Sequence, residues 1–267
     1  MAKKKKTSVT AFLATIAALI LFSFLPDSLQ STIKDLIGVG DSGGMSTSVD
    51  GLPKTASSYS TAKKYLYEDV HAGHRETLYC GCDYDSSKNV DLKGCGMSSV
   101  TDSRAKKVEA EHVVPASYMG GALPCWTQEL CTDGSGKSFK GRDCCQDIDP
   151  AFNAAHNDLH NLFPSVGEVN GARGNYLFGE VSGSDEDYGD CDFRIDRDAD
   201  RVEPPDRVKG DVARTWFYME ETYGVSISSS QRAMFESWSK QDPPDSWERE
   251  RNDRVARLQG KANPFIK

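Results

Sequence analysis

The chain has 267 residues, which is enough for one large domain or two small ones and for a substantial core. Its formal net charge is −8, from 32 Lys and Arg against 40 Asp and Glu, although residues 1–25 contain four lysines and no acidic residue. This balance excludes a simple basic nucleic-acid-binding protein. Binding to a polyanion would therefore require a locally basic cleft or a bound cation.

The N-terminal residues 1–25 predict an export segment, because lysines at 3–6 precede an uncharged run over 9–25. This run is slightly long for the apolar part of a cleaved signal peptide and slightly short for a spanning helix. No A-x-A cleavage site follows it. A signal peptide and an uncleaved N-terminal membrane anchor are both open, and both place the rest of the chain outside the cytoplasm.

Residues 26–58 are expected to form a flexible linker, because their second half is rich in Gly, Ser and Thr. Residues 59–267 are expected to form one folded domain of the α+β class. Ser60 should cap a helix that runs to about Ala72, with Leu66 and Val70 on one face.

Further elements follow in chain order. Residues 107–116, KVEAEHVVPA, are typical of a strand ended by Pro115. The pattern Ser165-x-x-Glu168 is a capping box, which predicts a helix that begins at Ser165. One more strand and three amphipathic helices are expected, with aromatic and aliphatic side chains in the core, at 191–195, 208–224, 228–241 and 244–260.

The helix predicted after Ser165 contains the sequence NGARG (170–174). Gly171 and Gly174 would each cost about 1 kcal/mol relative to Ala in a helix. Close approach of another group to the helix backbone would explain them, and an exposed, fraying helix is the alternative.

The chain has eight cysteines, an even number that predicts disulfides in an exported protein. Cys80 and Cys82 are too close together to bridge each other easily, as are Cys144 and Cys145. Each close pair is therefore expected to reach two different elements. Four bridges allow 105 pairings, which the sequence leaves open. Residues 117–150 are rich in loop-forming residues and contain four of the cysteines. They are expected to form a long excursion from the domain core that disulfides hold in place.

Two other segments have spacings that partly match metal sites. His156 and His160 have the H-x3-H spacing of a zinc helix, but the sequence is HNDLH and lacks the glutamate of HExxH. Residues 83–91, DYDSSKNVD, space oxygen atoms somewhat like a calcium loop, without its glycine and terminal glutamate. Structural histidines and a plain acidic hairpin are the favoured interpretations.

Glu111, His112 and Asn170 are the residues that point to catalysis. A carboxylate and an amide oxygen suit Mg²⁺, which usually takes one or two protein oxygens and keeps several waters. His112 is expected to act as the general base, since its ordinary pKa lies near neutrality. Adjacent residues on a regular strand point to opposite faces. For both Glu111 and His112 to serve one site, the strand must bulge or end there.

The chain resembles the bacterial endonuclease I family over residues 59–267. The matching motifs are YCGC (79–82), EHVVPA (111–116), DPAFN (149–153), NLFPSVGEVNGARGNY (161–176) and RNDRVARLQGKANPF (251–265). The family consists of exported, disulfide-bonded, non-specific nucleases of the ββα-metal, or His-Me finger, class. The resemblance therefore implies a ββα-metal core surrounded by helices and disulfide-pinned loops.

The resemblance implies a role for each matching residue. His112 would be the general base, Glu111 and Asn170 the ligands of Mg²⁺ (with Mn²⁺ or Ca²⁺ as replacements), and Arg142 the contact to the scissile phosphate. Ala110 stands where relatives usually carry tryptophan.

Three further residues are expected to bind substrate, namely Arg173, Asn161 and His160. One departure lies beside the first of them, since residues 173–175 read R-G-N where relatives often have R-S-N.

The expected activity is largely sequence-independent hydrolysis of DNA, and of RNA as well, to products with 5′-phosphates. The alternative is a weak or inactive disulfide-stapled domain that binds nucleic acid outside the cell. A monomer is expected, periplasmic, extracellular or anchored at the cell surface. The acidic segments 182–190 and 196–200 are expected to lie away from the cleft, so that activity tolerates high salt.

Overall fold

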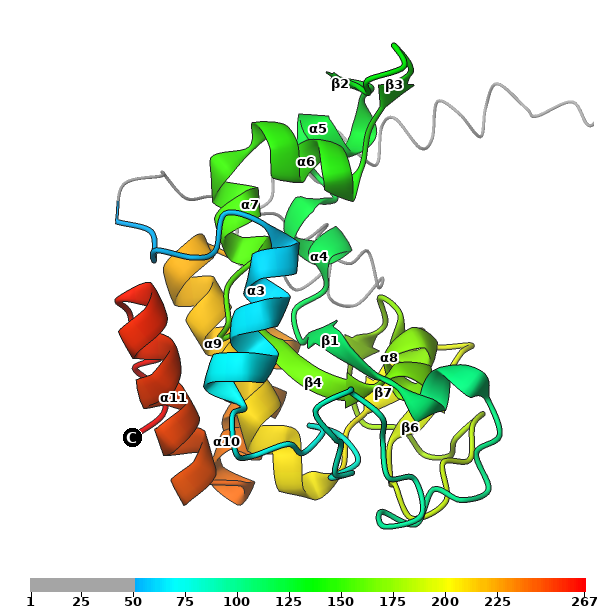
Figure 1. The fold of residues 1–267 in the computed structure, drawn as a ribbon. Coiled ribbons are helices and arrows are strands. Elements are labelled where there is room, and N and C mark those ends of the chain that lie inside the picture. Colours follow the sequence, from blue (N-terminus) through cyan, green and yellow to red (C-terminus); the bar gives the residue numbers. More distant parts are fainter. Residues whose placement is uncertain (1–50) are drawn as a thin grey trace, which may run out of the picture. The chain divides into compact units, whose positions relative to one another are not determined.

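The computed structural model describes residues 51–267, which form an α+β fold with short strands and several helices (Figure 1). The predicted export segment and residues 26–50 of the predicted linker lie outside the described residues. Within the described part of the chain, no helix is long and apolar enough to cross a membrane.

The first helical segment consists of α3 (Tyr59–Tyr65) and a π-helical turn, η1 (Leu66–Val70). Its cap is Ser58, which has an extended backbone and accepts a hydrogen bond from the Thr61 amide, so the predicted cap at Ser60 is wrong by two residues. Leu66 and Val70 are both fully buried, which confirms the predicted apolar face.

A pair of strands and a helix lie next to this segment. Strand β1 (Val108–His112) pairs antiparallel with β4 (Leu162–Val166), and the chain passes directly from β4 into α8 (Gly167–Arg173). The pairing runs without interruption from Val108 opposite Val166 to His112 opposite Leu162. Helix α8 packs against both strands.

The predicted capping box is wrong. Ser165 lies inside β4, paired with Glu109 and fully buried, and its hydroxyl donates to the Val166 carbonyl. The helix begins at Gly167, and its cap Val166 has no side-chain hydrogen bond. Pairing with β1 therefore outweighs the local capping preference of the sequence.

Close approach to the backbone of α8 is confirmed at Gly171 and applies to Gly167 as well. It is not found at Gly174, which follows the helix with a φ of +53° and where a Cβ would meet nothing closer than 3.8 Å. A short 3-10 turn, η2 (Ser103–Lys106), lies against the helix. A Cβ atom on Gly167 would lie 2.5 Å from the Arg104 carbonyl oxygen, and one on Gly171 would lie 2.3 Å from the Arg104 guanidinium. Any larger residue at either position would push Arg104 away from the helix.

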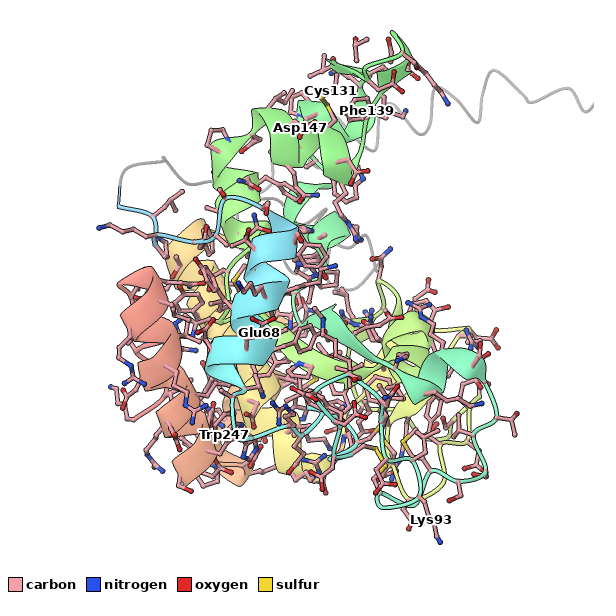
Figure 2. All side chains as sticks on the ribbon, in the orientation of Figure 1. Glu68, Lys93, Cys131, Phe139, Asp147 and Trp247 are labelled. Atoms are coloured by element: carbon pink, nitrogen blue, oxygen red, sulfur yellow. A yellow bond between two sulfur atoms is a disulfide. The ribbon has the colours of Figure 1, made fainter. Side chains whose placement is uncertain are left out.

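The excursion between β1 and β4 holds more regular structure than predicted. Figure 2 labels Cys131, Phe139 and Asp147 together in this part of the molecule, well separated from Trp247. Its elements are α4 (Ala116–Gly120), α5 (Pro124–Thr127), β2 (Cys131–Thr132), β3 (Ser138–Phe139), α6 (Arg142–Ile148) and α7 (Pro150–His156).

All eight cysteines form disulfides, and each close pair reaches two different elements as predicted. On α6, Cys144 bonds Cys131 of β2 and Cys145 bonds Cys125 of α5. The other close pair forms the bridges Cys80–Cys191 and Cys82–Cys95. The first two bridges hold the N-terminal end of α6 in place.

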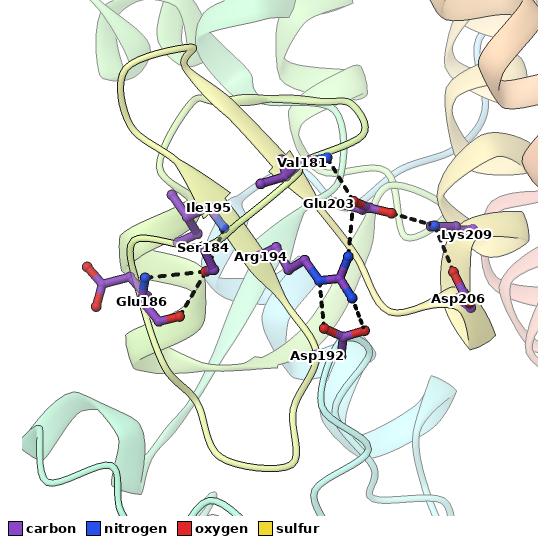
Figure 3. A network of polar contacts seen from close by, with 9 residues as sticks. All are labelled: Val181, Ser184, Glu186, Asp192, Arg194, Ile195, Glu203, Asp206 and Lys209. Carbon is purple, nitrogen blue, oxygen red and sulfur yellow. Dashed lines mark hydrogen bonds and ion pairs between the residues drawn. The ribbon is translucent and has the colours of Figure 1, made fainter.

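A three-stranded sheet of order β5-β7-β6 follows α8. An ionic cluster ties it to the next helix (Figure 3). Both oxygens of Glu203 are engaged: Oε1 accepts from Lys209 at 2.7 Å, and Oε2 accepts from the Val181 amide at 2.8 Å and lies 3.8 Å from Arg194. The strands are β5 (Leu177–Phe178), β6 (Arg194–Asp196) and β7 (Arg201–Glu203).

The C-terminal region confirms the three predicted helices. A 3-10 turn, η3 (Asp206–Val208), leads into α9 (Lys209–Tyr223), which packs along α10 (Ser229–Gln241), and α11 (Ser246–Gln259) follows. Trp216, Phe235 and Trp238 are buried in the main core, as their spacing predicts.

Candidate active site

A cavity of about 570 Å³ runs along β1 and is bordered by α3, α6 and α8. The acidic segments 182–190 and 196–200 contribute no residue to its lining among the described residues. The charged side chains that line it are five basic ones, Lys63, Lys88, Arg104, Arg142 and Arg173, and two acidic ones, Glu109 and Glu111. The cavity is thus locally basic in an acidic protein, which is favourable for a polyanionic ligand.

Glu111 is buried, and one of its two oxygens is fixed by two donors. Oε1 accepts from the Tyr79 hydroxyl at 2.7 Å and from Arg173 Nη1 at 2.9 Å. Burial raises the pKa of Glu111, while the Arg173 charge and the Tyr79 hydrogen bond act in the opposite direction. Because both side-chain donors share Oε1, Oε2 is left for another ligand.

His112 is held by one ring nitrogen. Its Nε2 lies 2.8 Å from the His156 carbonyl oxygen. A carbonyl can only accept, so Nε2 carries the hydrogen and Nδ1 carries the lone pair. Burial lowers the pKa of His112 well below its ordinary value. The ring is therefore neutral near pH 7 and can accept a proton at Nδ1.

The strand around this pair is regular and simply ends at His112. The pairing with β4 shows no bulge, and Glu111 and His112 face different surroundings, Arg173 in one case and the Tyr59 ring (5.4 Å between centroids) in the other. Both nevertheless line the same cavity. The reason is that the cavity follows the free edge of β1, where the Ala110 carbonyl accepts from the Tyr59 hydroxyl, so side chains from both faces reach it.

Asn170 lies on α8 with its amide fixed by a carboxylate. Its Nδ2 donates to Glu109 Oε2 at 2.7 Å, which turns Oδ1 away from Glu109. Burial opposes ionisation of Glu109, but hydrogen bonds from Arg104 and Asn170 outweigh it and lower its pKa. The sequence reasoning missed Glu109, although its spacing of two from Glu111 places both on one face of β1.

Arg142 is the first residue of α6 and is exposed. Within residues 51–267 its guanidinium has no hydrogen bond or ion pair, although its charge is close enough to lower the pKa of His112 and His156. The disulfides at Cys144 and Cys145 fix the helix that carries it. Arg142 thus offers an unpaired cation to the cavity.

The remaining candidates are buried. Arg173 is 1% exposed and donates to Glu111 and to the His112 and Val113 carbonyls. Asn161 bonds both backbone groups of Val114 through its side chain.

His160 and its neighbour His156 do not form a zinc helix. Helix α7 ends at His156, so the H-x3-H face does not form. The His160 ring donates to the Lys261 carbonyl at 3.0 Å, and neither His160 nor Asn161 lines the cavity. Residues 83–91 form a tight turn in which Asp85 accepts from Asn89.

Besides Glu109, the sequence did not point to Tyr59, Lys63 or Lys88, which also line the cavity. Tyr59 stacks on His112, and the ammonium groups of Lys63 and Lys88 lie over the Tyr59 and Tyr67 rings, at 4.7 and 4.3 Å from the centroids. No local sequence pattern identifies them, because tertiary packing brings Tyr59 and Lys63 of α3 and Lys88 of the 83–91 turn to the cavity.

Comparison with known proteins identifies the family of the chain. The model of the endonuclease I family matches residues 52–267. The chain belongs to the endonuclease I family. It is therefore an endonuclease, a hydrolase of phosphodiester bonds.

Several relatives in the endonuclease I family align along most of their length. An extracellular deoxyribonuclease of Aeromonas hydrophila is 41% identical, over 80% of this chain and 91% of that protein. A periplasmic deoxyribonuclease of the same species is 42% identical, over 74% and 80%. An extracellular ribonuclease of Bacillus amyloliquefaciens is 35% identical, over 77% and 71%. These names and the four disulfides agree in placing this endonuclease outside the cytoplasm.

Proposed function

We propose that this protein is a metal-dependent, largely sequence-independent endonuclease that cleaves DNA, and RNA as well, to 5′-phosphate products. One observation carries the proposal. Glu111, His112 and Asn170 are each anchored through one side-chain atom, while a second atom, Oε2, Nδ1 or Oδ1, remains for the cavity. Relatives named deoxyribonuclease and ribonuclease support both substrates.

The residues fit a bound Mg²⁺. Glu111 supplies an anionic oxygen and Asn170 a neutral one, from two elements that line one cavity. Residues 51–267 hold no group of three or more His, Cys, Asp and Glu placed around one metal, which argues against an all-protein zinc or calcium cage. Mg²⁺ needs only one or two protein oxygens beside water and phosphate, and Mn²⁺ and Ca²⁺ accept the same oxygen ligands. The ion would supply charge stabilisation at the phosphate.

His112 performs the proton transfer in this proposal. The His156 carbonyl holds Nε2–H, and Nδ1 takes a proton from a water molecule in the cavity. That water attacks phosphorus in line with the 3′-oxygen, which leaves and takes a proton from solvent, so the phosphate stays on the 5′-oxygen of the downstream fragment. Tyr59 keeps the imidazole plane in place by stacking.

The basic residues hold the substrate through its backbone. Arg142 is free to contact the scissile phosphate, and its fork of donors suits phosphate oxygens. Lys63 and Lys88 line the same cavity and would contact further phosphates. Phosphates are the same at every base, so these contacts make cleavage independent of sequence.

The strands β1 and β4 with helix α8 then form a ββα-metal core. They occur in the required order, two antiparallel strands followed by a helix that packs on both. The proposed base and one ligand lie at the end of β1, and the other ligand lies on α8.

The decisive experiment is nicking of a supercoiled plasmid by the parent protein and by His112→Ala, in Mg²⁺ and in EDTA. We expect Mg²⁺-dependent nicks that carry 5′-phosphates, and at least a thousandfold slower cutting by His112→Ala. Equal rates for the two proteins would overturn the assignment of the base. Activity restored by zinc alone would overturn the metal.

A further inference from the structure

Glu109 is a cavity carboxylate to which the proposed reaction assigns no step. It lies on the same face of β1 as Glu111, two residues earlier. Arg104 donates two hydrogen bonds to the Glu109 carboxylate, from Nε to Oε1 at 2.6 Å and from Nη2 to Oε2 at 2.7 Å. Asn170 Nδ2 donates to the same Oε2 at 2.7 Å. Glu109 therefore connects the proposed metal ligand on α8 to a fixed cation.

The chemistry of the amide gives this contact a consequence. The nitrogen and oxygen ends of an asparagine side chain have nearly the same size, so the hydrogen-bond partners decide which end points where. An ionised carboxylate can only accept, so it selects the Nδ2 end of Asn170. The oxygen end must then point the other way. A metal cation needs that oxygen and is repelled by the amide hydrogens.

The surroundings hold this arrangement rigidly. Two parallel hydrogen bonds leave the Glu109 carboxylate little freedom against Arg104. The turn that carries Arg104 lies directly on α8, where a Cβ at position 167 would meet the Arg104 carbonyl oxygen and one at position 171 would meet its guanidinium. The helix that carries Asn170 and the cation that orients Glu109 are thus packed against each other.

From this geometry we infer that Glu109 is a positioning residue, which fixes the amide of Asn170 so that Oδ1 faces the cation. The inference rests on the proposed function, because it requires a divalent cation bound by Asn170. In this arrangement Arg104 acts on the amide only through Glu109. Glu109 itself does not touch the ion, since both its oxygens are engaged by Arg104 and Asn170.

The test is Mn²⁺ binding to the substrate-free protein, measured by isothermal titration calorimetry and by the electron paramagnetic resonance of free Mn²⁺. The proteins are the parent, Glu109→Gln, Asn170→Asp, and the double variant. Glutamine can offer either a donor or an acceptor, so Glu109→Gln should weaken Mn²⁺ binding roughly tenfold or more, as expected when a group behind a metal ligand is lost. Asp at 170 has two equivalent oxygens and needs no orientation. In the Asn170→Asp background, Glu109→Gln should therefore cause no loss of affinity.

Each other result has a defined meaning. An equal loss in both backgrounds would show that Glu109 acts as a direct ligand or through its charge alone, and would overturn the inference. Unchanged Mn²⁺ affinity in Glu109→Gln would overturn it as well. If the parent and Asn170→Ala both fail to bind Mn²⁺, the proposed metal site itself is wrong. Near-ultraviolet circular dichroism checks that every variant is folded before its Mn²⁺ affinity is compared with that of the parent.

Glu168→Gln is the matched control. Glu168 lies on the same helix and interacts with the charge of Arg104, but the Asn170 amide donates to Glu109 and not to Glu168. We expect its Mn²⁺ affinity to equal that of the parent. A loss as large as that of Glu109→Gln would mean that charge near Arg104, and not the amide orientation, controls binding.

Discussion

Two polar clusters of this protein, around Glu203 and around Glu111, use the same kinds of residue in different ways. Around Glu203, both carboxylate oxygens are occupied by Lys209, Arg194 and a backbone amide. Around Glu111, both side-chain donors converge on Oε1 and leave Oε2 for the cavity. The first cluster is closed, and the second is open.

The structural cluster around Glu203 has both carboxylate oxygens occupied, and the cluster at the cavity keeps one oxygen free. Elsewhere in residues 51–267 some buried atoms, such as Trp216 Nε1 and His160 Nδ1, also lack a partner, so the contrast applies to these two clusters. A buried polar atom without a hydrogen-bond partner costs free energy, so most buried donors and acceptors in a protein have a partner. Three residues of the cavity depart from this rule. Glu111, His112 and Asn170 each have one side-chain atom that is hydrogen-bonded and a second one that is free. Substitutions in the open cluster should remove activity and spare stability, and those in the closed cluster should do the opposite.

The largest effect is expected for the open histidine. His112→Ala removes the only proton acceptor that the proposal places at the water, so kcat should fall by about 10³-fold. The unfolding free energy in urea should change far less than the activity. If His112→Ala lost both its activity and its cooperative unfolding, His112 would have a structural role like that of the residues around Glu203.

His160, which lies outside the cavity, should instead control acid stability. Burial lowers its pKa to about 4, with Arg251 and Lys261 acting in the same direction and Asp158 against them. The unfolded chain therefore binds this proton first as the pH falls. The stabilisation is complete above about pH 6.5 and should decrease by about 3 kcal/mol on approach to pH 4.

Urea unfolding between pH 7 and pH 4 measures this effect. His160→Gln keeps a donor for the Lys261 carbonyl and cannot titrate. Its stability should fall less steeply with acid than that of the parent. Identical slopes for the two proteins would show that His160 is not held neutral in the fold.

Arg142→Ala tests the unpaired cation of the open cluster. Loss of one charged donor at the reacting phosphate should reduce kcat by about 10²-fold. Stability should remain as in the parent, because the side chain is exposed. Lys140→Ala is the matched control, since Lys140 lies two residues away, bonds the Thr127 carbonyl and does not line the cavity.

Glu203→Gln tests the closed cluster. Breaking a buried ion pair usually costs about 3–5 kcal/mol, but Lys209 retains Asp206 as a partner. We therefore expect a loss of about 2 kcal/mol in unfolding free energy, without change in kcat per folded molecule. A loss of activity larger than the loss of stability would show that this cluster also supports catalysis.

The smallest effect is expected for Lys63→Ala. Its kcat should stay near the parent value, and the slope of log kcat/KM against log[NaCl] should become shallower by about one unit. Lys64→Ala is the control, because Lys64 pairs with Glu68 on the exposed side of the same helix. A steep decline of the parent from low salt upward would contradict the expected salt tolerance.

The sequence by itself determined a substantial part of this picture. The α+β class, the three C-terminal helices and the outward bridging of the close cysteine pairs follow from local patterns. The candidate pair Glu111-His112 and its distant partner Asn170 follow from residue chemistry and family motifs. These features depend on residue type and short spacing, which a single chain displays directly.

Only the tertiary structure decided how each polar atom is used. The tautomer of His112 depends on the His156 carbonyl, and the amide direction of Asn170 depends on Glu109. Ser165 lies in a strand, and not at a helix start, because β4 pairs with β1. These outcomes depend on partners far away in the chain, so no local sequence pattern encodes them.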